Sequence, residues 1–180
     1  MIKEKVKNAL NEQVNAEFYS AYLYLSMSSY FKKINLAGFA RWVEVQALEE
    51  LTHATKIFNF ICSRGEQVKL KAIDGPPTSW DTPLAVFEDV YNHEVKVTGL
   101  IHGLVDIAME EKDHATDNFL QWFITEQVEE EESADNIVQK LKLIGGEGGG
   151  LFLLDQELGA RVFTPLPGTT IIGGAASQTA

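Results

Sequence analysis

Cysteine is nearly absent from this chain of 180 residues, in which Cys62 is the only one. A single thiol cannot form a disulfide within the chain, so nothing indicates an oxidising compartment, and we expect Cys62 to be buried and unreactive. Residues 1–5 also lack the apolar stretch and the small-residue cleavage site of a secretory signal. These absences predict a cytoplasmic protein.

Long hydrophobic runs and basic charge are scarce as well. Serines and lysines interrupt the most apolar segment, around residues 21–31, so we expect a soluble chain without a membrane-spanning helix. Lysine and arginine together number 15 against 26 aspartates and glutamates, which gives a formal net charge of −11. Because binding to phosphate needs a basic face, we expect cations as partners and no nucleic acid. Acidity that only keeps the chain soluble explains this charge equally well.

Apolar residues recur at helical spacing in four long segments. We expect these helices at about residues 2–31, 36–64, 82–111 and 113–141. Gly65 supplies a left-handed end for the second helix. Asp81 or Thr82 can cap the third, with Pro83 in its first turn. Between these two helices, the glycine and prolines at 75–77 exclude a continuous helix. Short, long and short connections predict an all-α four-helix bundle with one long crossover between helices 2 and 3.

Glycine dominates the start of the C-terminal part. The glycines at 145, 146, 148, 149 and 150 are expected to break the chain before a short fifth helix at about 151–158. From Arg161 onward Thr, Pro, Gly and Ala predominate, as is typical of an extended or flexible segment. We predict one domain, residues 1–161, followed by a flexible extension, residues 162–180. The first helix is apolar nearly all round between residues 18 and 25, which predicts packing on both sides and hence an oligomer.

A set of metal-ligand-type residues occurs twice, with a constant shift of 77 positions (94 − 17, 127 − 50 and 130 − 53). The first set is Glu17, Glu50 and His53; the second is Glu94, Gln127 and Glu130. The same shift carries Glu49 onto Glu126. Such a repeat predicts two helical hairpins that fold against each other around a shared site.

Each of the four expected helices places a carboxylate on its inward, apolar stripe. Burying an unpaired carboxylate costs several kcal/mol or more, so Glu17, Glu50, Glu94 and Glu130 cannot all be bare anions. Protonation would compensate them in a purely structural polar core, but bound divalent cations would neutralise all four at once. Glu50 and His53 lie on one helix face, and mixed carboxylate and imidazole ligation suits iron better than magnesium or calcium.

The differences between the two sets predict unequal iron sites. We expect Glu50 to bridge two irons, with Glu17 and His53 on the first. Glu94 and Glu130 are then left for the second. Gln127 stands where Glu50 stands in the first set, and an amide is a neutral ligand or hydrogen-bonding group. The second iron should therefore be held more weakly.

At these residues, at Tyr24 and at four short segments, the chain resembles the non-haem ferritins of bacteria and archaea. The segments are Glu49-Glu50-Leu51-Thr52-His53-Ala54, Pro76-Pro77-Thr78-Ser79-Trp80, Gln121-Trp122-Phe123 and Glu126-Gln127-Val128-Glu129-Glu130. The resemblance covers residues 1–161. It implies a ferroxidase that oxidises Fe(II) with O2 or peroxide and stores ferric mineral inside a hollow shell of 24 identical subunits.

The resemblance also implies roles for residues outside the repeated set. Glu49, Glu126 and Glu129 are expected to bind a third iron beside the pair, sharing Glu130, although a solvated acidic face is the plainer interpretation. Tyr24 is expected to form a hydrogen bond near the irons and to donate an electron, or else to be an ordinary core tyrosine. Haem is not expected, because Thr52 stands where haem-binding relatives use methionine.

The other three histidines do not extend the predicted site, and two other functions are possible for such a bundle. His93, His102 and His114 fall off the inward stripes and are expected to be surface or capping residues. A rubrerythrin-like diiron peroxidase would carry a second Glu-x-x-His and usually a Cys-x-x-Cys domain, which are absent. A non-catalytic structural bundle would need protonated inward glutamates.

Overall fold

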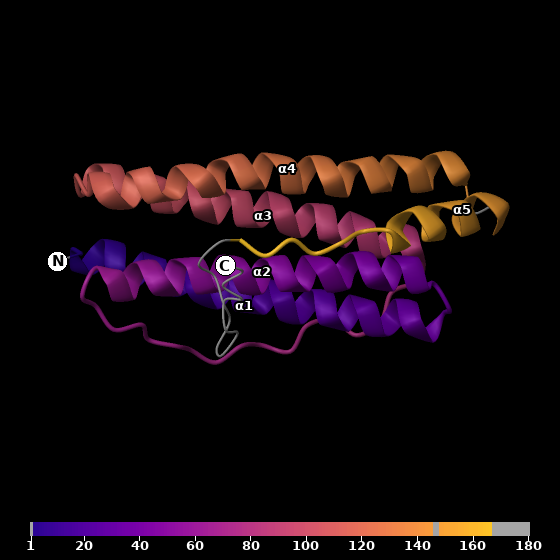
Figure 1. The fold of residues 1–180 in the computed structure, drawn as a ribbon, viewed down its shortest axis with the longest axis horizontal. Coiled ribbons are helices and arrows are strands. Elements are labelled where there is room, and N and C mark those ends of the chain that lie inside the picture. The colour runs from indigo at the N-terminus through magenta and orange to yellow at the C-terminus, as the bar shows by residue number, and fades with distance from the viewer. Residues whose placement is uncertain (1, 146–147, 167–180) are drawn as a thin grey trace, which may run out of the picture.

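The computed structural model describes residues 2–145 and 148–166, which form an all-helical bundle (Figure 1). The helices of these residues are α1 (Glu4–Lys33), α2 (Ala37–Ser63), α3 (Pro83–Glu110), α4 (His114–Ile144) and α5 (Gly148–Gly159). Short turns join α1 to α2 and α3 to α4, while the connection from α2 to α3 runs along the length of the bundle. The predicted four-helix bundle with one long crossover and a short fifth helix is confirmed.

The helix ends follow local sequence chemistry. Gly65, directly after the C-cap of α2, and Gly145, the C-cap of α4, adopt left-handed φ angles of 79° and 60°, where glycine has no steric penalty. The Thr82 side chain accepts a hydrogen bond from the Ala85 N–H at the start of α3. Asp113 does the same for the Thr116 N–H in α4. The predicted ends at Gly65 and Thr82 are therefore confirmed.

The start of the fifth helix differs from the prediction. The helix begins at Gly148, so the glycines at 148, 149 and 150 form its first turn and do not precede it. Tertiary packing overrides their low helix propensity, because Leu154 and Leu158 are buried in the bundle core. Gly146 lies outside the described residues.

Helix α5 also completes the N-terminus of α2. The Asp155 carboxylate accepts hydrogen bonds from the Gly38 and Phe39 N–H groups, at 2.8 and 3.1 Å. These are N–H groups of the first turn of α2, which have no partner within their own helix. A Cβ on Gly38 would lie 1.6 Å from the Asp155 carbonyl oxygen, so only glycine allows this approach. Residues 117 positions apart in the sequence, Gly38 and Asp155, thus meet at one end of the bundle.

Two apolar clusters fill the bundle, one toward each end. One contains Phe31, Phe39 and Phe87, while the other contains Leu10, Ile61 and Leu120. Between them lies a layer of buried polar side chains from all four long helices: Glu17, Gln46, Glu50, His53, Glu94, Gln127 and Glu130. A buried polar layer of this kind is stable only when its groups are paired or bind a ligand.

Several side chains and one segment are exposed at the surface of the bundle. Cys62 is exposed, which corrects the expectation of a buried thiol. It lies in the last turn of α2, on the side of the helix that faces solvent. Tyr22 and Leu25 on α1 are about half exposed, at 50% and 52%, on the segment expected to contact another subunit. Among the described residues, no helix is both long and apolar enough to cross a membrane. Residues 161–166 have no regular secondary structure, and the rest of the predicted extension, 167–180, lies outside the described residues.

Candidate metal centre

The six repeated residues converge at the middle of the bundle. Glu17 comes from α1, Glu50 and His53 from α2, Glu94 from α3, and Gln127 and Glu130 from α4; all are at most 6% exposed. Helical periodicity explains this convergence, since each residue continues an apolar stripe that faces the other helices. The predicted placement of the six side chains on the inner faces of the four long helices is therefore observed.

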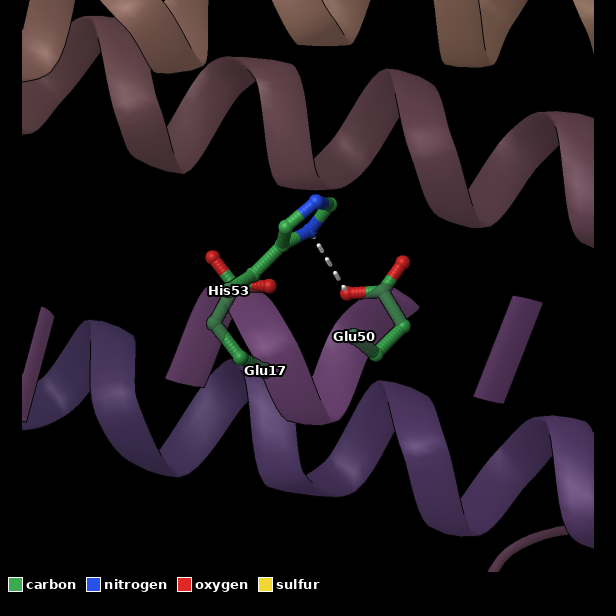
Figure 2. A group of neighbouring side chains, drawn as sticks. All are labelled: Glu17, Glu50 and His53. Carbon is green, nitrogen blue, oxygen red and sulfur yellow. Dashed lines mark ion pairs between the residues drawn. The ribbon is translucent and has the colours of Figure 1, made fainter. Parts of the chain in front are cut away.

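The first set forms a compact group of potential ligands (Figure 2). One ligand atom each from Glu17, Glu50 and His53 lies within 4.8 Å of the others, and the His53 Nδ1 atom is 3.5 Å from Glu50 Oε2. The Gln13 amide donates a hydrogen bond to Glu17 Oε1 at 2.9 Å. The other buried oxygens, Glu17 Oε2 and Glu50 Oε2, accept no hydrogen bond from an N–H or hydroxyl group of the described residues, and the two carboxyl groups can bond only to each other through a proton on one of them. Buried oxygens without partners are unfavourable unless a ligand occupies the space between them.

Burial changes the acidity of all four glutamates. Loss of solvation, with a smaller contribution from the charge on Glu50, raises the pKa of Glu17 to about 8. Burial also raises the pKa of Glu94 to about 7, that of Glu130 to about 8, and that of Glu50 well above its usual range. At neutral pH the metal-free site therefore holds protons that a divalent cation would displace.

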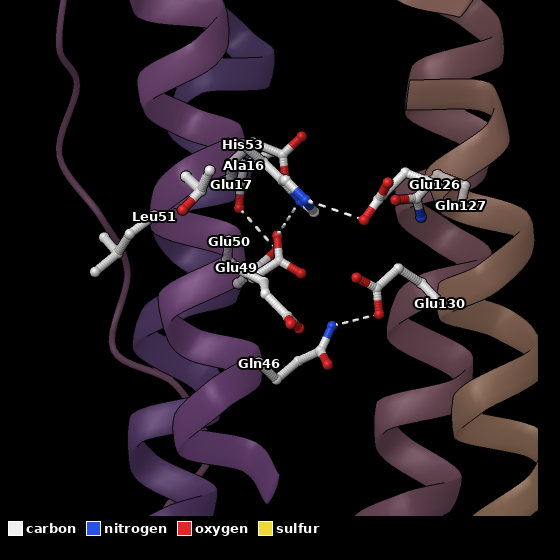
Figure 3. Close-up of polar contacts among 12 residues, drawn as sticks. Ala16, Glu17, Gln46, Glu49, Glu50, Leu51, His53, Glu126, Gln127 and Glu130 are labelled. Atoms are coloured by element: carbon white, nitrogen blue, oxygen red, sulfur yellow. Dashed lines mark hydrogen bonds and ion pairs between the residues drawn. The ribbon is translucent and has the colours of Figure 1, made fainter. Parts of the chain in front are cut away.

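The carboxylates of the second set have partners within the protein. The Tyr24 hydroxyl donates a hydrogen bond to Glu94 Oε1, and the Gln127 amide lies 3.4 Å from Glu94 Oε2. The Gln46 amide donates to Glu130 Oε2 at 2.5 Å (Figure 3). Tyr24 is fully buried, and burial together with the Glu94 charge raises its hydroxyl pKa well above the usual value. Neutral donors thus stabilise this half of the site without a metal.

A second group of potential ligands lies beside the first. One ligand atom each from His53, Glu126 and Glu130 lies within 4.8 Å of the others, with His53 Nε2 4.0 Å from Glu126 Oε1 (Figure 3). Of the residues predicted for a third iron, Glu126 and Glu130 therefore meet. Glu129 is exposed, and Glu49 instead forms an ion pair with Arg161. The third site remains a prediction.

The sequence did not indicate several neighbours of these groups. Gln46 lies on the apolar stripe of α2, one turn before Glu50, and this position was the only signal of its role. Gln13 lies one turn before Glu17 but was not distinguished from other polar residues of α1. Arg161 contacts Glu49 across 112 positions of the chain, and no local pattern could have predicted that contact.

The off-stripe histidines differ from one another. His102 and His114 are exposed, as expected. His93 is half-buried, with Nε2 2.8 Å from the Ser20 hydroxyl and its ring edge-on to Tyr24 at a centroid separation of 6.0 Å. Burial, with a smaller contribution from Lys96, lowers its pKa to about 4. The expectation of a surface or capping residue is therefore wrong for His93, whose ring packs against the ring of Tyr24.

Comparisons with known proteins agree with this geometry. Residues 7–144 match the family model of the ferritin-like domain. The chain is 50% identical over 161 residues to a bacterial non-heme ferritin of Bacteroides fragilis, covering 89% of this chain and 100% of that protein. A bacterial non-heme ferritin of Staphylococcus aureus is 38% identical over 163 residues, covering 91% of this chain and 98% of that protein.

Solved structures show the same fold. An Archaeoglobus fulgidus ferritin engineered into a closed form superposes with a TM-score of 0.90 at 60% identity, covering 91% of this chain and 100% of that one. An open-pore ferritin of the same archaeon superposes with a TM-score of 0.89 at 59% identity, covering 90% and 100%. The residues matched by the family model, 7–144, contain all seven side chains of the buried polar layer.

Proposed function

The chain belongs to the ferritin family, and on that premise we propose that it stores iron and oxidises Fe(II) at the buried site of its own bundle. Two Fe(II) ions bind side by side and together give electrons to O2 or peroxide. The resulting Fe(III) leaves the site and is deposited as mineral inside a hollow shell. Iron is thus the substrate and the cargo of the protein.

The single observation that carries this proposal is the buried group of Glu17, Glu50 and His53, in which one potential ligand atom of each residue lies within 4.8 Å of the others. A purely structural bundle with protonated glutamates agrees with the raised pKa values. In such a bundle one proton shared between Glu17 and Glu50 satisfies their facing oxygens, but protonation does not explain why the His53 imidazole also lies within 4.8 Å of both carboxyl groups. A divalent cation accounts for both oxygens and for the neighbouring imidazole.

Each residue then has a specific task. Glu50 bridges the two irons, Glu17 and His53 bind the first, and Glu94 and Glu130 bind the second. Hard anionic oxygens favour Fe(III) over Fe(II) and so lower the reduction potential. The protons that the glutamates hold in the metal-free state are released when iron binds.

The proposal also includes a third iron beside the diiron site and an assembly of identical subunits. A third iron binds near Glu49, Glu126 and Glu129 and shares Glu130, which the short separation of Glu126 from His53 and Glu130 supports. The protein assembles as a homo-oligomer of 24 subunits in the cytoplasm, and the half-exposed Tyr22 and Leu25 of α1 support a subunit contact there. Haem takes no part.

The test adds Fe(II) to the metal-free protein without oxygen, counts the bound ions, and then admits O2 while ultraviolet absorbance follows Fe(III). The wild-type chain should bind two Fe(II) tightly and oxidise them within seconds. His53→Ala should lose this fast phase, whereas His102→Ala, which changes an exposed histidine, should keep it. A fast phase of normal amplitude in His53→Ala would contradict the proposed site.

A further inference from the structure

Arg161 is the second residue after the end of α5, and its side chain lies back against α2. The guanidinium donates to Glu49 Oε2 at 2.5 Å, to Gln46 Oε1 at 2.8 Å and to the Trp42 carbonyl at 3.4 Å. Its carbon lies 4.3 Å from the centre of the Trp42 ring. The Arg161 carbonyl in turn accepts a hydrogen bond from Arg41 Nε at 3.2 Å. The residue is thus held in one place by several independent contacts.

Two of these contacts lead to residues that the proposed function assigns to iron. Glu49 is a proposed ligand of the third iron, and Arg161 binds it directly. Gln46 uses its oxygen for Arg161 and its amide nitrogen for Glu130 Oε2, at 2.5 Å. Because an amide has one acceptor and one donor end, the Arg161 contact keeps the donor end turned toward Glu130.

The ion pair between Arg161 and Glu49 is only partly open to solvent, since the two side chains are 22% and 24% exposed. Less water screens such a pair than screens an ion pair at the surface. A metal ion at Glu49 would compete with the guanidinium for the same carboxylate and would be repelled by its positive charge. The two cations therefore exclude each other at Glu49.

We propose that Arg161 is a tethered cation that occupies Glu49 in the iron-free protein, and that the third iron binds only by displacing it. This inference rests on the proposed third site. The displacement weakens the third position relative to the diiron pair, so the third iron binds last and leaves first. Arg161 acts on iron through Glu49 and Gln46, and it is a positioning residue.

An arginine suits this role better than a lysine. The planar guanidinium reaches Glu49 with one nitrogen and Gln46 with another while stacking on Trp42, whereas an ammonium is a single point charge. Arg161→Lys keeps the positive charge but removes the two nitrogens that contact Glu49 and Gln46 together. This variant therefore separates simple charge competition from the combined contact.

The test is calorimetric titration of the metal-free assembled protein with Zn²⁺, which is redox-inert. Arg161→Gln should tighten the third Zn²⁺ by about tenfold, the scale of one partly buried ion pair, and should leave the affinity for the first, at Glu17, Glu50 and His53, within a factor of about two. Arg161→Lys should fall between these values. Glu49→Gln should abolish the third site in either background.

A charge-matched control is available in the same region. Lys140 on α4 forms an ion pair with Glu157 on α5 at 2.5 Å, away from Glu49. Lys140→Gln removes one positive charge and one ion pair to α5, and it should leave all three Zn²⁺ affinities unchanged. A general charge effect would instead shift Lys140→Gln and Arg161→Gln alike, which would overturn the inference.

A second readout follows Arg161 itself. In a Trp80→Phe, Trp122→Phe background, Trp42 is the remaining tryptophan, and loss of the guanidinium from its ring should change its fluorescence. This change should accompany the third Zn²⁺ and not the first two. Adding Arg161→Gln to this background should abolish it.

The possible failures are distinguishable. If the wild-type chain binds no Zn²⁺ tightly and His53→Ala keeps the fast phase of Fe(II) oxidation, the proposed function is wrong as well. If the first two ions bind but the third is equally weak in wild type and Arg161→Gln, or persists in Glu49→Gln, only the inference about Arg161 is wrong. A third ion seen in Arg161→Gln alone would support it.

Discussion

The two halves of the bundle place equivalent residues around one site, yet they compensate buried charge in different ways. In the α1–α2 half, Glu17 and Glu50 each retain a buried oxygen that accepts no hydrogen bond from an N–H or hydroxyl group of the described residues. In the α3–α4 half, Glu94 accepts from Tyr24 and faces the Gln127 amide, and Glu130 accepts from Gln46. The first half is arranged for a cation, whereas the second is already satisfied by neutral donors.

This difference explains how one site can hold two irons with unequal strength. A cation entering the first half displaces protons from Glu17 and Glu50, whose facing oxygens accept no bond from an N–H or hydroxyl group of the described residues. A cation entering the second half must compete with hydrogen bonds that the protein has already formed. The substitution of Gln127 for the glutamate found in the first half, at Glu50, adds to this asymmetry, because it removes one anionic ligand. We therefore expect the first half to dominate metal binding.

The sharpest test substitutes the equivalent position in each half. Glu50→Ala removes the bridging ligand and should slow rapid Fe(II) oxidation by about a hundredfold or more. Gln127→Ala removes a neutral group at the corresponding position and should slow it by no more than about tenfold. Stopped-flow absorbance after mixing with O2 measures both rates. Equal losses in the two variants would abolish the distinction between the halves.

The second prediction concerns stability and pH in the absence of metal. The pKa values of Glu17 and Glu130, about 8, and of Glu94, about 7, exceed the unfolded value of 4.5. Between about pH 4.5 and 8 the folded chain therefore binds more protons than the unfolded chain, so the free energy of unfolding should fall as pH rises. The decrease should be on the order of a few kcal/mol and should be reversed by Zn²⁺.

Urea unfolding of the metal-free protein from pH 5 to 8 measures this slope. Glu17→Gln and Glu94→Gln provide the comparison of the halves. Glu17→Gln should flatten the slope more, because donors from Tyr24 and Gln127 oppose the rise in the pKa of Glu94. A stability that increases over this pH range would contradict the buried, protonated state of these groups.

The third prediction makes the two halves more alike. Gln127→Glu places a carboxylate at the position that corresponds to Glu50 and should tighten the second metal ion by about tenfold. The metal-free protein should lose about 1–3 kcal/mol of stability, because a further buried acid lies beside Glu94. Zn²⁺ titration and urea unfolding test the two effects. Gln67→Glu adds the same charge at an exposed residue and should change neither the affinity for the second metal ion nor the stability of the metal-free protein.

The smallest expected effect is that of Tyr24→Phe. This substitution removes the hydroxyl that donates to Glu94 and should slow Fe(II) oxidation by about two- to fivefold, while the first metal ion binds as before. Tyr22→Phe, on the exposed face of the same helix, is the matched control. An unchanged rate in Tyr24→Phe would show that Tyr24 is an ordinary core tyrosine without a role in oxidation, which is the alternative interpretation of the sequence.

Much of the fold was predictable because its information is local. Helical periodicity located α1, α2 and α3 within about three residues at each end, and Gly65 and Thr82 marked two of those ends. The start of α5 was not predictable, since three glycines disfavour a helix locally and the burial of Leu154 and Leu158 supplies the compensation. Exposure of Cys62 was mispredicted because the apolar stripe of α2 does not extend around the helix to that position.

The candidate site divides in the same way. Glu17, Glu50, His53, Glu94 and Glu130 could be identified from one dimension, because each interrupts an apolar stripe and recurs after a shift of 77 (94 − 17). Of their partners, Tyr24 alone was expected near the irons; its contact with Glu94 and the contact of Gln46 with Glu130 could not be identified in this way. Tyr24 meets Glu94 over 70 positions, Gln46 meets Glu130 over 84, and Arg161 meets Glu49 over 112.

The amino-acid sequence by itself determined which side chains face the interior, since a residue's direction on a helix depends only on its spacing from its neighbours. Tertiary structure alone decided which of those buried acids receives a donor and which is left for a cation. Hydrogen bonds and ion pairs depend on distances of a few ångströms between helices, and those distances are set only when the four helices and the C-terminal segment pack together.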